Sequence, residues 1–339
     1  IEWKIVSQAK AIKELGGLKL AMQYLALPKL DSDFFNLSNF SEYDTDNAYD
    51  YFKRHIGQKA ADYLADGFSS TYQFHRATEI SKGAMLGIMH SLKTAAKNWD
   101  LHRTQGGMQA LPNALAKLLN VRLNTTIKDV VANEDHCLVD GEKFDQVVFA
   151  STASATQAIY QNPTVEQAQL LRQAKYASSI SIAYRVPKKL LPDIAIVWVP
   201  YVESPKITGF VNEAMKGPEL TNEHEALLCT WLHEDFATSI MQLPDEEIFS
   251  QAKNELLRIC PWVSDPAQLQ NHDLQRWPEA MPKFYPGYLK KVKDFLENGQ
   301  GQQNVYFCGD YMNSLWTEGA LRGGKRTAAV IIQDSKFKS

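Results

Sequence analysis

The residues best suited to hold a ligand lie near the end of the sequence, at positions 304–332. A short apolar strand pattern ends at Gly309 and Asp310, and a helical pattern that opens with Glu-Gly-Ala at 318–320 follows after a loop. The free N–H groups and the dipole of such a helix start favour an anionic or electron-rich group. The Asp310 carboxylate could accept hydrogen bonds from sugar-like hydroxyls. A C-terminal helix whose small residues serve packing alone is the alternative that this local chemistry leaves open.

A second segment has a glycine turn followed by short strand patterns. Gly106-Gly107-Met108 precedes a short helix that has Pro112 in its first turn, and strand patterns follow at Val121–Leu123 and Ile127–Val131. Further strand patterns at 137–139 and 146–150 complete what reads as a meander, and the last ends in small residues from Ala150 onward. A plain β-meander is an equally good interpretation of Ile127 taken alone.

A third segment, at 277–287, is rich in aromatic residues. Trp277, Phe284 and Tyr285 could wall an apolar cleft for a flat substrate. Core packing of any one of these rings is the alternative.

In their order and spacing, these three segments resemble the flavin-dependent amine oxidase and protoporphyrinogen oxidase superfamily. In that family the aspartate of the Gly-Asp turn contacts the ribityl or pyrophosphate part of FAD, and the Glu-Gly-Ala helix start faces the flavin. The middle segment packs beside the adenine, and a Trp-x-x-Ala-x-Pro stretch lies near the flavin. The resemblance therefore assigns cofactor contacts to Gly106, Gly107, Met108, Ile127, Ala150, Gly309, Asp310, Glu318, Gly319 and Ala320. Gly323-Gly324 replaces the usual Ser-Gly of the family, which keeps small residues there.

The resemblance implies hydride transfer from a substrate C–H bond to flavin, followed by reoxidation by oxygen or a quinone. Many amine oxidases place a lysine near the flavin, but the corresponding strand at 177–185 has serine there. This departure favours a protoporphyrinogen-oxidase-like or desaturase-like dehydrogenation of a small apolar or flat substrate. The alternatives are an amine oxidase proper and a non-catalytic binding module or degenerate relative. The catalytic residues stay unassigned.

One expected element of the family is missing from this sequence. Members open with a strand, a Gly-x-Gly-x-x-Gly turn and a helix that holds the FAD pyrophosphate. Neither Gly16-Gly17 nor Gly83–Gly87 has that context, and the sequence starts at Ile1 instead of methionine. We therefore expect that the opening segment is absent, and that the chain as given binds FAD weakly or not at all.

These residues must be positioned by helices and strands, and the sequence patterns of those elements predict an α/β (α+β) fold with a mostly antiparallel sheet. Helical patterns occupy 9–27, 46–66 (with a break at Gly57), 81–97 and 246–259, and strands are expected at 180–185, 194–199, 207–211 and 226–232. We expect the chain to alternate between two domains. Residues 1–103 would form the helical part and 161–290 the sheet part of a substrate domain, and 104–160 and 291–339 would form an incomplete FAD-binding domain.

Composition excludes several classes of protein. The net charge is −3 without a long basic run, which argues against nucleic-acid binding. The four cysteines include no CxxC pair, so neither a disulfide framework nor a zinc site is indicated, and no metal site is expected. No apolar run reaches the ~18 residues of a membrane span. We expect a cytoplasmic protein and leave peripheral membrane contact and oligomeric state open.

Overall fold

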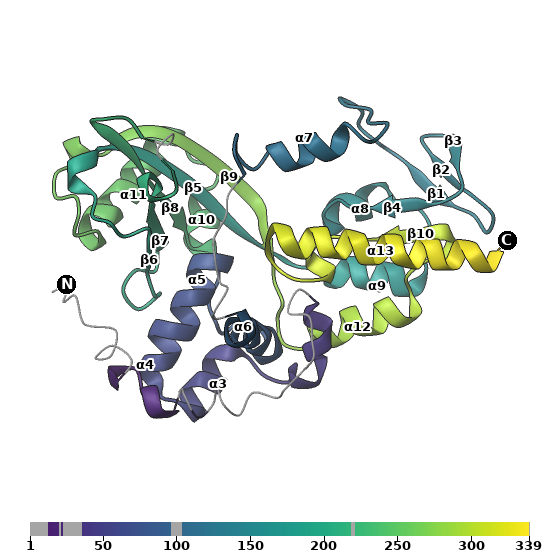
Figure 1. Ribbon diagram of the computed structural model, residues 1–339, viewed down its shortest axis with the longest axis horizontal. Helices are drawn as coiled ribbons and strands as arrows, with labels where there is room; N and C mark the ends of the chain where they lie inside the picture. Colours follow the sequence, from purple (N-terminus) through teal and green to yellow (C-terminus); the bar gives the residue numbers. More distant parts are fainter. Residues whose placement is uncertain (1–12, 20–21, 23–35, 96–103, 218–220, 339) are drawn as a thin grey trace.

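The computed structural model describes residues 13–19, 22, 36–95, 104–217 and 221–338 of the 339-residue chain. Most of the predicted helix at 9–27 lies outside these residues. The described chain forms a five-stranded sheet at one end, a bundle of helices beside it, and a second mixed region that ends in a long C-terminal helix (Figure 1).

The five-stranded sheet is antiparallel throughout and has the strand order β6-β7-β8-β5-β9. Alternate residues of β5 and β8 are buried, and α11 buries residues at helical spacing against the sheet. These residues form a core of their own. The strands are β5 (Tyr176–Pro187), β6 (Ile196–Trp198), β7 (Ile207–Asn212), β8 (Glu225–Leu232) and β9 (Gln270–Pro282), and the covering helices are α10 (Glu234–Ile240) and α11 (Asp245–Ile259).

The helical segment before residue 96 packs against both the sheet and the second region. Its elements are η1 (Leu37–Tyr43), α3 (Ala48–His55), α4 (Gln58–Ala60), the π-helical η2 (Ala61–Asp66), α5 (Gly67–Gln73) and α6 (Lys82–Ala95). Gly57, at φ 142°, separates α3 from α4, so the predicted break is confirmed. Buried side chains of α3, η1 and α6 share one core with β4, β10 and α12.

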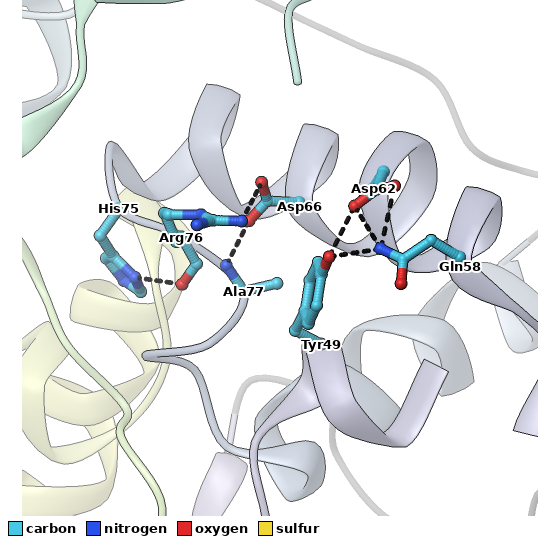
Figure 2. Close-up of polar contacts among 7 residues, drawn as sticks. All are labelled: Tyr49, Gln58, Asp62, Asp66, His75, Arg76 and Ala77. Atoms are coloured by element: carbon cyan, nitrogen blue, oxygen red, sulfur yellow. Dashed lines mark hydrogen bonds and ion pairs between the residues drawn. The ribbon is translucent and has the colours of Figure 1, made fainter. Parts of the chain in front are cut away.

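Polar contacts hold this segment together (Figure 2). The hydroxyl of Tyr49 on α3 donates to Asp62 Oδ1 over 2.6 Å, and the Gln58 amide also donates to Asp62. Asp66, whose side chain is fully buried, accepts the Ala77 backbone N–H at 2.8 Å. The loop that follows α5 is therefore tied back to the start of that helix.

The second region combines two small sheets with five helices. Strands β1 (Val130–Ala132), β2 (Cys137–Val139) and β3 (Glu142–Phe144) form an antiparallel sheet, and β4 (Val147–Phe149) pairs in parallel with β10 (Val305–Phe307). The helices are α7 (Ala110–Ala116), α8 (Ala153–Ile159), α9 (Val165–Gln173), α12 (Tyr288–Asn298) and α13 (Trp316–Lys338). Helix α13 runs alongside β10 in Figure 1. Short 3-10 turns η3, η4, η6, η7 and η8 cover 188–190, 213–215, 266–268, 302–304 and 310–312.

The mixed fold with a mostly antiparallel sheet is confirmed, as are the helix at 246–259 and the four strands predicted between 180 and 232. The strand predicted at Val121–Leu123 is wrong, because those residues form no ladder. The expected meander is also wrong in part, since β4 leaves it to pair with β10, more than 150 residues later. No helix of the described residues is long and apolar enough to cross a membrane.

Candidate functional site

The candidate site begins where the two parallel strands end. The register pairs Phe307 of β10 with Phe149 of β4, and the Cys308 N–H donates to the Phe149 carbonyl at 2.9 Å. Ala150 and Gly309 therefore leave the sheet side by side. The carboxyl ends of parallel strands are where α/β folds commonly bind ligands, because the chain turns away from the sheet there.

The turn after β10 presents one carboxylate. Gly309 has φ 151°, and a Cβ added to it would lie 3.0 Å from the ring of Tyr311, so the turn favours glycine. Asp310 is only partly buried, and its Oδ1 accepts the Tyr311 backbone N–H at 2.8 Å. Burial raises the pKa of Asp310, while that backbone hydrogen bond lowers it. No protein group in the described chain is hydrogen-bonded to the other oxygen, which leaves an acceptor at this edge.

Helix α13 starts directly against that turn. A Cβ on Gly319 would lie 2.2 Å from the carbonyl oxygen of Ser314, so only glycine fits. The Asn313 amide donates to the Gly319 carbonyl at 2.6 Å, which fixes the loop to the helix. A Cβ on Gly323 would lie 3.4 Å from the Gly309 oxygen, which shows how closely the helix approaches the turn.

The other two residues of the predicted helix start are less buried than Gly319. Ala320 is exposed, and Glu318 is partly buried. The Arg322 guanidinium donates to Glu318 at 2.6 Å across one helical turn. Gly309, Asp310, Gly319 and Ala150 are thus brought to one place.

The glycine turn of the middle segment has the backbone form that its sequence suggests. Gly106 and Gly107 have φ values of 82° and 86°, and nothing lies within 4 Å of a Cβ added to either. Met108 is 57% exposed, whereas Ile127 is partly buried against the core. No hydrogen bond in the described chain joins these residues to Asp310.

The three predicted cleft rings differ in burial. Trp277 on β9 is 51% exposed, and its indole N–H donates to Ser181 Oγ at 3.2 Å. Phe284 is buried in the core, which does not support our expectation for this ring. Tyr285 is partly buried, and its hydroxyl donates to the Gln173 carbonyl at 2.9 Å. Core packing, the alternative at the sequence level, describes Phe284 better.

Sequence reasoning missed the tyrosines beneath the turn. The Ala153 N–H, at the start of α8, donates to the Tyr176 hydroxyl at 2.9 Å, and the rings of Tyr176 and Tyr311 lie 6.4 Å apart. Burial raises the pKa of Tyr176, and the nearby Asp310 raises it further. The hydroxyls of Tyr288 and Tyr311 are buried without a protein partner in the described chain. Nothing in the local sequence marks these rings, since they come from three separate elements, β5, α12 and η8.

Comparison with known proteins gives a consistent result. The family model described as flavin containing amine oxidoreductase matches residues 13–332. Cyclohexylamine oxidase from Brevibacterium oxydans superposes with a TM-score of 0.66 at 13% identity, with 99% of this chain and 77% of that chain covered. A putative protoporphyrinogen oxidase from Exiguobacterium sp. superposes with a TM-score of 0.69 at 14% identity, with 99% of this chain and 74% of that chain covered. A CLA-producing fatty acid isomerase from P. acnes superposes with a TM-score of 0.69 at 14% identity, with 97% of this chain and 77% of that chain covered. No curated protein sequence matches.

Proposed function

Because this chain belongs to the family of flavin-containing amine oxidoreductases, we propose that it is an FAD-dependent oxidoreductase of the protoporphyrinogen-oxidase-like or desaturase-like kind. Bound FAD would supply the acceptor for a hydride equivalent from a substrate C–H bond, and oxygen or a quinone would reoxidise it. The protein's own contribution is to bind, orient and shield the reacting groups.

The observation that carries the proposal is the meeting of the Asp310 turn with the start of α13. Asp310 has a carboxylate oxygen available to accept a hydrogen bond from a ribityl or ribose hydroxyl. Gly319 lets the start of α13 pack closely against Ser314, and the first N–H groups of a helix favour an electron-rich group. Ala150, which is exposed, and Gly309 follow the paired ends of β4 and β10. These residues fit the ribityl arm and ring of a flavin.

We extend the proposal to the remaining predicted contacts. Glu318 and Ala320 would line the flavin ring, and Ile127 would lie near the adenine. Gly106, Gly107 and Met108 would form the turn that precedes the adenine side. The two-domain division of the chain belongs to the same proposal. The five-stranded sheet has a core of its own, whereas the helical part before residue 96 shares its core with β4, β10 and α12.

Strand β5 supports dehydrogenation of an apolar substrate over amine oxidation. Neither position that could correspond to the family's lysine is basic. The Ser179 hydroxyl donates to the Leu232 carbonyl at 2.8 Å, and Ser181 accepts from Trp277. No ammonium group stands there to hold a proton or a water molecule. A small apolar or flat substrate therefore suits this site better than a charged amine.

A titration of FAD into the wild-type chain and Asp310→Ala tests the proposal, with flavin fluorescence as the readout. It is extended to high FAD concentration, because we expect this chain to bind FAD weakly. Loss of a hydrogen bond to a charged group costs about 1.5–3 kcal/mol, so affinity should fall about tenfold or more. Asp294→Ala removes an exposed carboxylate of α12 and is the matched control. Equal affinity of Asp310→Ala and wild type for FAD would contradict the proposal.

A stability measurement separates this role from packing. Since burial raises the pKa of Asp310, its ionised form is disfavoured by the fold at neutral pH. Asp310→Asn should therefore keep or raise the free energy of unfolding of the ligand-free chain at pH 7. A marked loss of stability in Asp310→Asn would indicate that the carboxylate serves the fold instead of a ligand.

A further inference from the structure

Buried polar side-chain atoms without a protein partner concentrate on α5 and on the loop that follows it. Within the part of the chain that the structure describes, such atoms belong to Ser69, Ser70, Gln73, His75 and Arg76, and His233 adds one directly after β8. A buried polar atom is costly unless it has a hydrogen-bond partner. This region therefore suits a ligand that supplies the partners that the protein itself does not provide.

Three of these residues, His75, Arg76 and His233, form what we call the Arg–His cluster. The Arg76 guanidinium lies 4.3 Å from the centre of the Tyr201 ring, and the His233 imidazole meets the same ring at 5.1 Å between centroids. The Nδ1 of His75 lies 3.1 Å from the Arg76 carbonyl oxygen (Figure 2). Because a carbonyl can only accept, Nδ1 carries the hydrogen, and the Nε2 of the neutral ring keeps its lone pair.

The acids around the cluster already have partners. Asp66 accepts a backbone N–H of the loop at 2.8 Å, and its other oxygen lies 3.4 Å from Nη2 of Arg76 (Figure 2). The Lys283 ammonium donates to Glu79 at 2.9 Å and also pairs with Glu234. In the described chain, the atoms of the cluster that remain without a partner are Nε of Arg76 and Nε2 of each histidine.

The surroundings of the two imidazoles are positively charged. Burial, together with the nearby charge of Arg76 and with His75, lowers the pKa of His233 to about 3. Burial and, less strongly, the Lys283 ammonium lower the pKa of His75 to about 4, although the Arg76 carbonyl and Glu79 act the other way. Cations near both rings disfavour a further positive charge, and the same charges favour an anion at this place.

We infer that the Arg–His cluster binds a carboxylate where the helical segment meets the five-stranded sheet. The two parts are joined there, because the Glu234 N–H donates to the Phe74 carbonyl at 2.9 Å. One carboxylate oxygen would accept the Arg76 Nε–H, and the other would accept a hydrogen from Nε2 of a protonated histidine. The ligand would enter beside Arg76, whose side chain is 30% exposed.

Proton uptake is the signature of this mode of binding. The Nε2 of His75 has no hydrogen while the ring is neutral, so the ring must gain a proton before it can donate to the carboxylate. The proton comes from the solvent, and the carboxylate stays ionised and favours the charged ring. The site does not involve the Asp310 turn, so it stands independently of the proposed function.

Isothermal titration calorimetry with decanoate tests the inference on the flavin-free chain. We expect saturable binding at pH 7 with uptake of about one proton per carboxylate, measured from the heats in two buffers of different ionisation enthalpy. Affinity should rise as the pH falls from 7.5 to 6, by up to about tenfold per pH unit, because one proton accompanies each ligand. This measurement needs only the wild-type chain.

Glutamine variants locate the binding site. His75→Gln and His233→Gln keep a polar side chain that cannot gain a proton, so each should weaken decanoate binding about tenfold or more. His75→Gln should also abolish the proton uptake. His272→Gln is the matched control, because His272 is exposed and forms a second Arg–His contact with Arg185 outside the cluster. Its affinity should equal that of wild type, and circular dichroism ensures that only folded variants are compared.

Decanol and propionate complete the test. Decanol has the same chain without the carboxylate and should bind at least tenfold more weakly than decanoate. Propionate affinity within tenfold of decanoate would support a small free carboxylate as the ligand, and weaker propionate binding would support the head group of a longer apolar acid. Decanol that binds as tightly as decanoate, no proton uptake by the wild-type chain, or wild-type affinity in both glutamine variants of the cluster would each overturn the inference.

Discussion

Replacement of Gly319 by alanine is the sharpest perturbation that the structure allows. The added Cβ would lie 2.2 Å from the carbonyl oxygen of Ser314 and 2.4 Å from its hydroxyl. Carbon atoms need about 3.5 Å, so the loop or the helix start must move by about 1 Å. Such overpacking against backbone costs about 3 kcal/mol, which exceeds the gain of about 1 kcal/mol in helix propensity. The site that holds Asp310 would be displaced with it.

Gly324→Ala is the matched control, because Gly324 lies on the same helix with nothing within 4 Å of an added Cβ. It should stabilise the chain by about 0.5–1 kcal/mol through helix propensity alone. Urea unfolding measures both variants, and an FAD titration measures the site. Gly319→Ala with the stability and flavin affinity of wild type would refute the packing that we describe around the start of α13.

Two further predictions concern the helical segment and its contact with the sheet. Gly209→Ala places a Cβ 3.0 Å from Thr71 and 2.8 Å from a backbone oxygen of β6, so the free energy of unfolding should fall by about 1–3 kcal/mol. A wild-type free energy of unfolding would contradict the tight packing. Burial, together with nearby cations, lowers the pKa of His75 to about 4 and that of His233 to about 3. The unfolded chain therefore binds more protons than the folded chain below pH 6.5. The free energy of unfolding, measured with urea, should be highest above that pH and fall steadily towards pH 4, both in wild type and in the exposed control His55→Gln. A free energy of unfolding that does not change with pH would contradict neutral buried histidines.

Local signals made the Asp310 turn and the start of α13 predictable. An apolar run, a Gly-Asp turn and a small-residue helix start are adjacent in sequence, and their geometry follows from local backbone preferences. The break at Gly57 was visible for the same reason. The structure then supplied what the sequence could not, namely that Ala150 lies beside Gly309 through a parallel pairing across more than 150 residues.

The features that sequence reasoning missed depend on distant contacts. Strand β9 is largely exposed and polar and contains Pro278, so it lacks the alternation by which a strand is predicted. It exists because it pairs along most of the length of β5. The contacts of Tyr72 with Phe68, Trp198 and Trp316 could not be predicted either, since these rings come from α5, β6 and α13. Phe284 is buried, which is one of the two alternatives that its sequence left open, because sequence gives the type of a side chain but not its burial.

Amide hydrogen exchange in the presence of saturating FAD tests the central claim most directly. We predict that FAD slows exchange in the segments around Ala150 and at 309–320, and that Asp310→Ala abolishes this protection. Protection confined to other segments, or unchanged exchange at 309–320 with FAD demonstrably bound, would contradict the assignment of the flavin site to this turn and helix.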